Sequence, residues 1–339
     1  MIRKAVVILA LGLAALAVMA NLPRGGVRPA SVAASPDVGG KIAYARAGAI
    51  WMYTGGRQQQ LTKGPGDRQD KRDGQPSFSP DGTQIVYARF DEGFSDLYKL
   101  DVADPSATVA LTHNRPQAET GELGYTAQAL WAMQPAWSPN GERIAYTSDV
   151  RTEYPGLFSM DPEGDNVRKL EHLDHSIQTV EHPTWSPEGT KIAVANYVTR
   201  NGTGQIWVLD AASDKWTELT DTKDGAYDPA WSPDGEWIAF TMRDGAAHNI
   251  YVVPTDAQKW TGDGNHPTPI QLTTDGASRA PAWSPDGSRL AYVALKDGSF
   301  DIYDAQVALG ADSNPKLENT QKLTDKANID ATSGLSWGK

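Results

Sequence analysis

The sequence predicts an all-β protein, a six-bladed β-propeller whose ring is closed by the C-terminal strand completing the first blade. Three observations lead to this: a repeated turn motif, its spacing, and incomplete repeats at the two ends of the repeat region. The motif is Pro, a small residue, Trp or Phe, then Ser-Pro-Asp-Gly or a close variant. It occurs five times, and its serines are Ser79, Ser138, Ser186, Ser232 and Ser284. Successive serines are 59, 48, 46 and 52 residues apart, which suits four short strands per repeat.

Each repeat carries the signals of four strands in order. The aromatic residue before the serine belongs to the first strand, and the turn that follows is a tight hairpin, because Pro presets φ and Gly accepts a left-handed conformation. Apolar runs predict second strands at 84–88, 143–147, 191–195, 237–241 and 289–293. Third strands are expected at 96–98, 205–207, 249–251 and 301–303, and Leu-Thr pairs at 111–112, 219–220, 272–273 and 323–324 are interpreted as fourth strands.

An aromatic residue stands at the same position of every repeat. These are Phe78, Trp137, Trp185, Trp231 and Trp283. Because the position is identical in each copy, we expect the rings to pack between adjacent blades. A sugar-stacking surface is the alternative.

The ends of the repeat region predict how the ring closes. Residues 41–45, 50–53 and 60–62 supply a second, third and fourth strand with no first strand before them. Gly334-Leu-Ser-Trp-Gly338 supplies a first strand, with Trp337 placed 54 residues after Trp283. Five whole blades and one split blade make six, and closure removes exposed sheet edges.

The remaining sequence predicts an exported protein. Arg3 and Lys4 precede an apolar run over 5–20, the pattern of a signal peptide or an N-terminal anchor at residues 1–20. Residues 21–40 are rich in Pro, Gly, Ala and Ser and are interpreted as a flexible linker, with the propeller at 41–339. We expect a periplasmic or extracellular monomer with no membrane contact beyond that anchor.

Composition excludes several classes of function. The formal net charge is −11 and the chain has no Lys/Arg-rich block, so a nucleic-acid backbone would be repelled. There are no cysteines, which excludes disulfides, zinc–thiolate sites and thiol nucleophiles.

The motifs resemble the TolB-type propeller repeat, a Pro-x-Trp-Ser-Pro-Asp-Gly-x-x-Ile-Ala-Tyr core followed by Asp-Ile-Tyr and Leu-Thr. The resemblance covers residues 41–338. Similar repeats occur in periplasmic TolB, in the propeller domains of prolyl-oligopeptidase-type peptidases and in oligogalacturonate lyases. We expect neither the N-terminal α/β domain of TolB nor a hydrolase nucleophile elbow. The resemblance implies a non-catalytic envelope protein that binds a protein or peptide partner.

Strand order predicts where a ligand binds. The Ser-Pro-Asp-Gly turns share one face, and the other face collects the blade connections and the first residues of the innermost strands, where propeller ligands usually bind. The candidate partner-binding residues at this channel mouth are Gln75, Gln134, Glu181, His182, Tyr227, Asp228 and Arg279. A solvated rim whose side chains satisfy one another is the alternative. Tyr125 and Trp131, in the connection 113–133, are further candidate anchors.

We expect no catalytic residue, bound metal or cofactor. The alternative function is a metal-dependent polysaccharide lyase or hydrolase. In that case His175 and His182, with Glu181 or Asp228, would hold a divalent metal.

Overall fold

The computed structural model describes residues 37–64, 71–117, 130–150, 155–170, 179–197, 203–260 and 266–339. They belong to one compact unit, Ser35–Lys339. The expected signal at 1–20, most of the linker, Tyr125 and His175 lie outside the described residues. No helix in the described ranges is long and apolar enough to cross a membrane.

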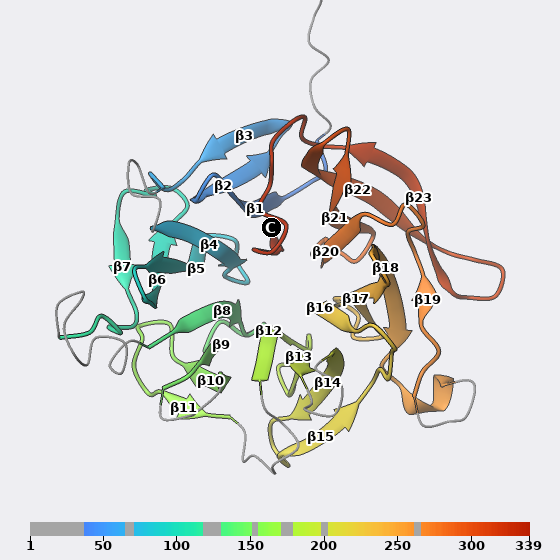
Figure 1. Ribbon diagram of the computed structural model, residues 1–339, viewed down its shortest axis with the longest axis horizontal. Coiled ribbons are helices and arrows are strands. Elements are labelled where there is room, and N and C mark those ends of the chain that lie inside the picture. The colour runs from blue at the N-terminus through green and yellow to red at the C-terminus, as the bar shows by residue number, and fades with distance from the viewer. Residues whose placement is uncertain are drawn as a thin grey trace, which may run out of the picture. The chain divides into compact units, whose positions relative to one another are not determined.

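The described strands form six four-stranded antiparallel sheets, arranged as blades around a central channel (Figure 1). Blade 1 contains β24 (Leu335–Gly338), β1 (Lys41–Arg46), β2 (Ala49–Thr54) and β3 (Arg57–Gln60). Blade 2 contains β4 (Arg72–Phe78), β5 (Gln84–Asp91), β6 (Phe94–Asp101) and β7 (Thr108–Ala110). Blade 3 contains β8 (Ala132–Trp137), β9 (Ile144–Ser148), β10 (Gly156–Met160) and β11 (Arg168–Lys169).

The other three blades repeat this order from the channel outward. Blade 4 contains β12 (Thr179–Trp185), β13 (Lys191–Tyr197), β14 (Gly204–Asp210) and β15 (Lys215–Glu218). Blade 5 contains β16 (Ala226–Trp231), β17 (Trp237–Asp244), β18 (Ala247–Pro254) and β19 (Ile270–Gln271), with a short 3-10 helix, η1 (Ala257–Lys259), before β19. Blade 6 contains β20 (Ser278–Trp283), β21 (Arg289–Lys296), β22 (Ser299–Leu309) and β23 (Pro315–Lys322).

The ring closes as the sequence predicts. Strand β24 pairs antiparallel with β1, with Trp337 opposite Ile42 and Leu335 opposite Tyr44. The C-terminus therefore lies near the centre of the ring, between β4 of blade 2 and β20 of blade 6 (Figure 1). The six-bladed fold is confirmed.

The apolar core consists of clusters between neighbouring blades. Val86 and Leu97 of blade 2, for example, share a cluster with Ile144 and Phe158 of blade 3. Each of the six blade interfaces has one such cluster among the described residues, and each contains one ladder aromatic: Phe78, Trp137, Trp185, Trp231, Trp283 or Trp337. Trp283 Nε1 also donates across an interface to the Ala230 carbonyl (3.1 Å). The aromatic positions therefore join blades rather than forming an exposed surface.

The Ser-Pro-Asp-Gly turns are hairpins closed by the serine. Ser79 Oγ donates to Asp81 Oδ1 (2.6 Å) and accepts from Gln84 N (2.9 Å). Gly82 N donates to the Ser79 carbonyl (2.8 Å), and Gly82 adopts φ +69, which a glycine tolerates without steric strain.

The Leu-Thr pairs have a different role from the one expected. They lie just after the fourth strands instead of within them, and they form hydrogen bonds with the third strand of the same blade. Leu323 N donates to the Ile302 carbonyl (2.8 Å), and Thr324 Oγ1 accepts from Ile302 N (3.0 Å). The same hydroxyl donates to the buried carboxylate of Asp301 (2.9 Å). The Asp-Ile-Tyr and Leu-Thr motifs therefore form one clasp between strands.

Candidate functional site

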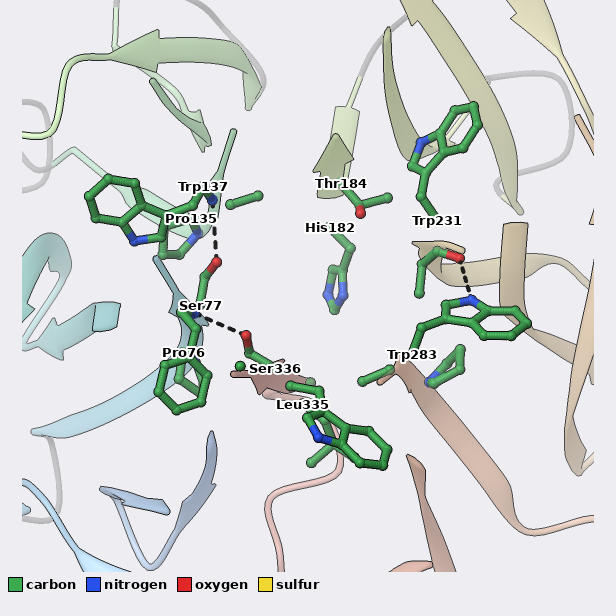
Figure 2. Close-up of a pocket in the computed structure, with 18 of the residues that line it drawn as sticks. Pro76, Ser77, Pro135, Trp137, His182, Thr184, Trp231, Trp283, Leu335 and Ser336 are labelled. Atoms are coloured by element: carbon green, nitrogen blue, oxygen red, sulfur yellow. Dashed lines mark hydrogen bonds between the residues drawn. The ribbon is translucent and has the colours of Figure 1, made fainter. Parts of the chain in front are cut away.

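The central channel is a cavity of about 470 Å³ lined by the inner strands of all six blades. Figure 2 shows the imidazole of His182 pointing from β12 into the middle of this cavity. Side chains of adjacent inner strands connect across the cavity wall: Ser336 Oγ accepts from Phe78 N (3.0 Å), and Ser77 Oγ accepts from Trp137 N (3.3 Å) (Figure 2).

The sequence placed the start of each inner strand at the residue just before the repeated proline. In the structure, these strands begin two or three residues earlier. Each strand pairs with its neighbour, breaks register at a bulge and resumes, because proline has no N–H to donate. The residue before proline adopts a left-handed conformation, with φ between +53 and +56 at Gln75, Gln134, His182, Asp228 and Ala280. Such strain costs on the order of 1 to 3 kcal/mol per residue.

Hydrogen bonds between blades compensate for this strain. Gln134 N donates to Gln75 Oε1 (2.9 Å), and His182 N donates to Gln134 Oε1 (3.1 Å). Gln75 N donates to Ser333 Oγ, which precedes β24. We call this chain of contacts the channel ring. It ties β4, β8 and β12 each to the segment or strand of the blade before it.

An ion pair continues the channel ring across blades 4 and 5. His182 Nδ1 lies 3.0 Å from Asp228 Oδ1, with side-chain exposures of 22% and 19%. Thr241 Oγ1 donates to Asp228 Oδ2 (2.9 Å) and accepts from Ala280 N (3.0 Å), which extends the ring into blade 6. Burial lowers the pKa of His182, but the Asp228 charge, the hydrogen bond to Asp228 and the Glu181 charge together outweigh burial, so the net shift is upward. Burial raises the pKa of Asp228, yet the His182 charge and hydrogen bonds lower it overall.

A second, smaller cavity of about 190 Å³ opens where these inner strands begin, on the face opposite the Ser-Pro-Asp-Gly turns. We call it the mouth pocket. Its lining includes all five residues predicted on consecutive blades: Glu181, His182, Tyr227, Asp228 and Arg279. Gln75 and Gln134, the other two predicted residues, lie in the channel ring and line the central cavity.

The walls of the mouth pocket are held in place by local contacts. Tyr197 and Tyr227 pack with ring centroids 6.0 Å apart and planes tilted by 41°, and Tyr197 OH donates to Glu181 Oε2 (3.0 Å). Tyr227 lies directly on the backbone of Gly225, where a Cβ would come within 2.2 Å of its hydroxyl. Glycine is therefore required for this ring position.

Besides two alanines, Ala195 and Ala331, sequence reasoning did not assign four lining residues to the pocket: Tyr197, Thr241, His248 and Thr332. Tyr197 and Thr241 lie on second strands, opposite Thr179 and Tyr227 in the sheet register. Pairing the predicted second strands with the first strands of the same blades would have placed Tyr197 and Thr241 at the pocket. Strand order allows His248, on β18, to approach this face, whereas nothing in the sequence indicated Thr332, which lies in the connection before β24.

The described histidines do not gather into a metal centre. No group of three His, Asp or Glu side chains in the described ranges is arranged to hold a metal ion. His248 lines the mouth pocket, His113 lines a different cavity in blade 2, and His266 lies 3.7 Å from Glu218. Trp131 packs against Phe90 with ring centroids 6.4 Å apart, which leaves it part of an apolar cluster.

One expectation about catalysis needs correction. Gly334-Leu-Ser-Trp-Gly338 spells the Gly-x-Ser-x-Gly pattern of a nucleophile elbow, which we had expected to be absent. The structure places all of this segment but Gly334 in inner strand β24, where Ser336 lies opposite Ala43 and its hydroxyl accepts from Phe78 N. An elbow requires a strand-to-helix turn, so the pattern here is coincidental.

Comparison with known proteins supports the same architecture. The "TolB beta propeller domain" family model matches residues 124–278. Crystallised TolB from Acinetobacter baumannii is 15% identical, with a TM-score of 0.63 over 89% of this chain and 67% of that one. A putative TolB from Agrobacterium tumefaciens is 19% identical, with a TM-score of 0.59 over 86% and 91% of the two chains. At these identities the structural likeness concerns the fold.

The regions similar to this chain make up different shares of the relatives' own lengths. An uncharacterized peptidase, YuxL of Bacillus subtilis, is 26% identical over 52% of this chain but only 31% of its own length. The uncharacterized protein Atu1656 of Agrobacterium fabrum is 29% identical over 64% of this chain and 83% of its length. A TolB homolog of Chlorobium luteolum is 26% identical over 63% of this chain and 45% of its length. The chain thus spans under half of two of these relatives.

Proposed function

We propose that this TolB-like six-bladed β-propeller is an exported, non-catalytic scaffold that binds a protein or peptide partner at the mouth of its central channel. The observation that carries the proposal is the mouth pocket, which gathers side chains from blades 4, 5 and 6. Aromatic walls beside polar groups suit the recognition of a peptide segment. Export follows from the expected signal at residues 1–20.

The polar groups of the pocket favour binding over chemistry. The Asp228 carboxylate accepts from Thr241 and pairs with His182, and Glu181 accepts from Tyr197. These acids are occupied in holding strands together, so they serve as a rigid frame for a ligand. Rigid, preorganised walls reduce the entropy lost on binding.

A metal-dependent polysaccharide lyase is the alternative. A crystallised oligogalacturonate lyase of Vibrio parahaemolyticus has a TM-score of 0.51 and 13% identity over 79% of this chain and 74% of its own, a likeness of fold. The ligand set considered for that function includes His175, outside the described residues. The mouth pocket therefore gives more direct support to partner binding.

Capture from an envelope extract of the source organism tests the proposal. The immobilised wild-type protein should retain at least one protein that a Tyr227→Ala/Asp228→Ala/Arg279→Ala variant retains at least about tenfold less, since buried contact groups carry most binding energy. Lys215→Ala, on the opposite face, serves as the control and should retain it fully. Equal capture by the wild-type protein and the triple variant would contradict partner binding at the mouth.

A further inference from the structure

The guanidinium of Arg279 is the feature of the mouth pocket that the fold leaves unused. Arg279 lies on β20, and its charged end packs 5.5 Å from the centre of the Phe300 ring. Its Nε atom is buried and has no hydrogen-bond partner in the described part of the chain. None of the ion pairs found among the described residues includes Arg279. A buried donor without an acceptor costs free energy unless a ligand or water supplies one.

The acids nearest to Arg279 in the pocket have other partners. Asp228 pairs with His182 and accepts from Thr241, and Glu181 accepts from Tyr197. Burial, and then the charge of Arg279, lower the pKa of His248, which favours the neutral imidazole there. Arg279 thus lines a pocket with one buried donor lacking an acceptor, and the Asp228 carboxylate, whose pKa the Arg279 charge helps to lower, is hydrogen-bonded to other groups.

We propose, resting on the function proposed above, that the mouth pocket binds the carboxylate side chain of an acidic residue in a peptide, with Arg279 as its anchor. The planar guanidinium presents paired N–H donors that match a carboxylate, and the Phe300 ring orients that plane. The pocket volume of about 190 Å³ admits one amino-acid side chain, while Tyr197 and Tyr227 form a wall for the adjoining peptide.

Binding of matched peptides to the full chain tests the assignment. The probes are two blocked pentapeptides that differ only in a central glutamate or glutamine among alanines, measured by NMR titration. The wild-type protein should prefer the glutamate peptide by about tenfold or more, since a charge-assisted hydrogen bond contributes that much. Arg279→Gln should reduce the preference to about one. Arg279→Lys keeps the positive charge but not the paired, planar N–H donors, so it should leave an intermediate preference.

Arg72→Gln is the matched control. Arg72 also packs on an aromatic ring, 4.6 Å from the centre of Phe90, at the start of another inner strand. This variant should keep the full preference. A preference near one in the wild-type protein, or one that persists in Arg279→Gln, would overturn the proposal, as would tighter Arg279-dependent binding of free galacturonate than of the glutamate peptide.

The same measurements separate this proposal from partner binding itself. If the peptide preference is absent while the triple variant still loses its captured partner, the carboxylate assignment fails and partner binding stands. If Arg279 discriminates the peptides but the triple variant captures partners as the wild-type protein does, partner binding at the mouth fails instead.

Discussion

His182 and Asp228 illustrate how one residue position in this fold combines structure with recognition. Both precede a proline, both adopt positive φ, and their side chains meet 3.0 Å apart at the wall of the channel. The left-handed backbone of His182 directs its N–H toward Gln134 of the preceding blade, and the side chains of both residues lie at the channel mouth. The residue before the proline thus differs in type between blades, while its backbone conformation is the same in each of these blades.

The His182–Asp228 pair predicts a defined titration. The folded-state pKa of His182 lies above its ordinary value of 6.5, so its stabilising contribution is complete below 6.5 and is lost as pH rises through the folded-state pKa. Asp228→Asn removes the larger of the two carboxylate charges that raise the pKa of His182, so this pKa should fall below its wild-type value. An NMR titration of the His182 ring protons measures the shift. Asp312→Asn, an exposed change, should leave the titration unaltered, and an unchanged His182 titration in Asp228→Asn would contradict the pairing.

At the scale of the strands, two sets of hydrogen bonds explain why the sequence motifs recur from blade to blade. The clasp between Thr324 and Asp301 locks the third strand to the end of the fourth, and the channel ring locks inner strands to one another. The Leu-Thr and Asp-Ile-Tyr motifs recur because each supplies one half of the clasp. The ring residues differ among blades because any acceptor that reaches the next N–H will serve: glutamine in blades 2 and 3, and a threonine hydroxyl in blade 5.

Removing one link of the channel ring should destabilise the fold measurably. Gln134 Oε1 accepts from both His182 N and Thr147 Oγ1, so Gln134→Ala leaves the His182 N–H without its acceptor and leaves Thr147 Oγ1 only the Met133 carbonyl (3.3 Å). We expect a loss of about 1 to 3 kcal/mol in the free energy of unfolding, measured by chemical denaturation. Gln59→Ala, on exposed strand β3, should change it by less than about 0.5 kcal/mol. Equal effects of the two substitutions would argue against a stabilising ring.

For the whole molecule, the sequence predicted the architecture far better than the site. Fold, blade number and closure through Trp337 follow from features that every blade repeats, and repetition makes a weak signal strong. Strand order also indicated which residues begin the inner strands, so Glu181, Tyr227 and Arg279 could be grouped in advance. The bulge before each proline, the role of Leu-Thr and the pocket contributions of His248 and Thr332 depend on hydrogen bonds and packing between segments, which no local pattern specifies.

The central claim is that the channel mouth is the surface by which this propeller binds a protein. Site-specific photo-crosslinking in the source organism tests it most directly, with a photoreactive amino acid replacing Tyr197 in the mouth pocket or, as control, Trp260 in the loop on the opposite face. The account predicts a discrete crosslinked protein from position 197, lost when Arg279→Gln is added, and none from position 260. A crosslink confined to position 260, or none from position 197, would contradict it.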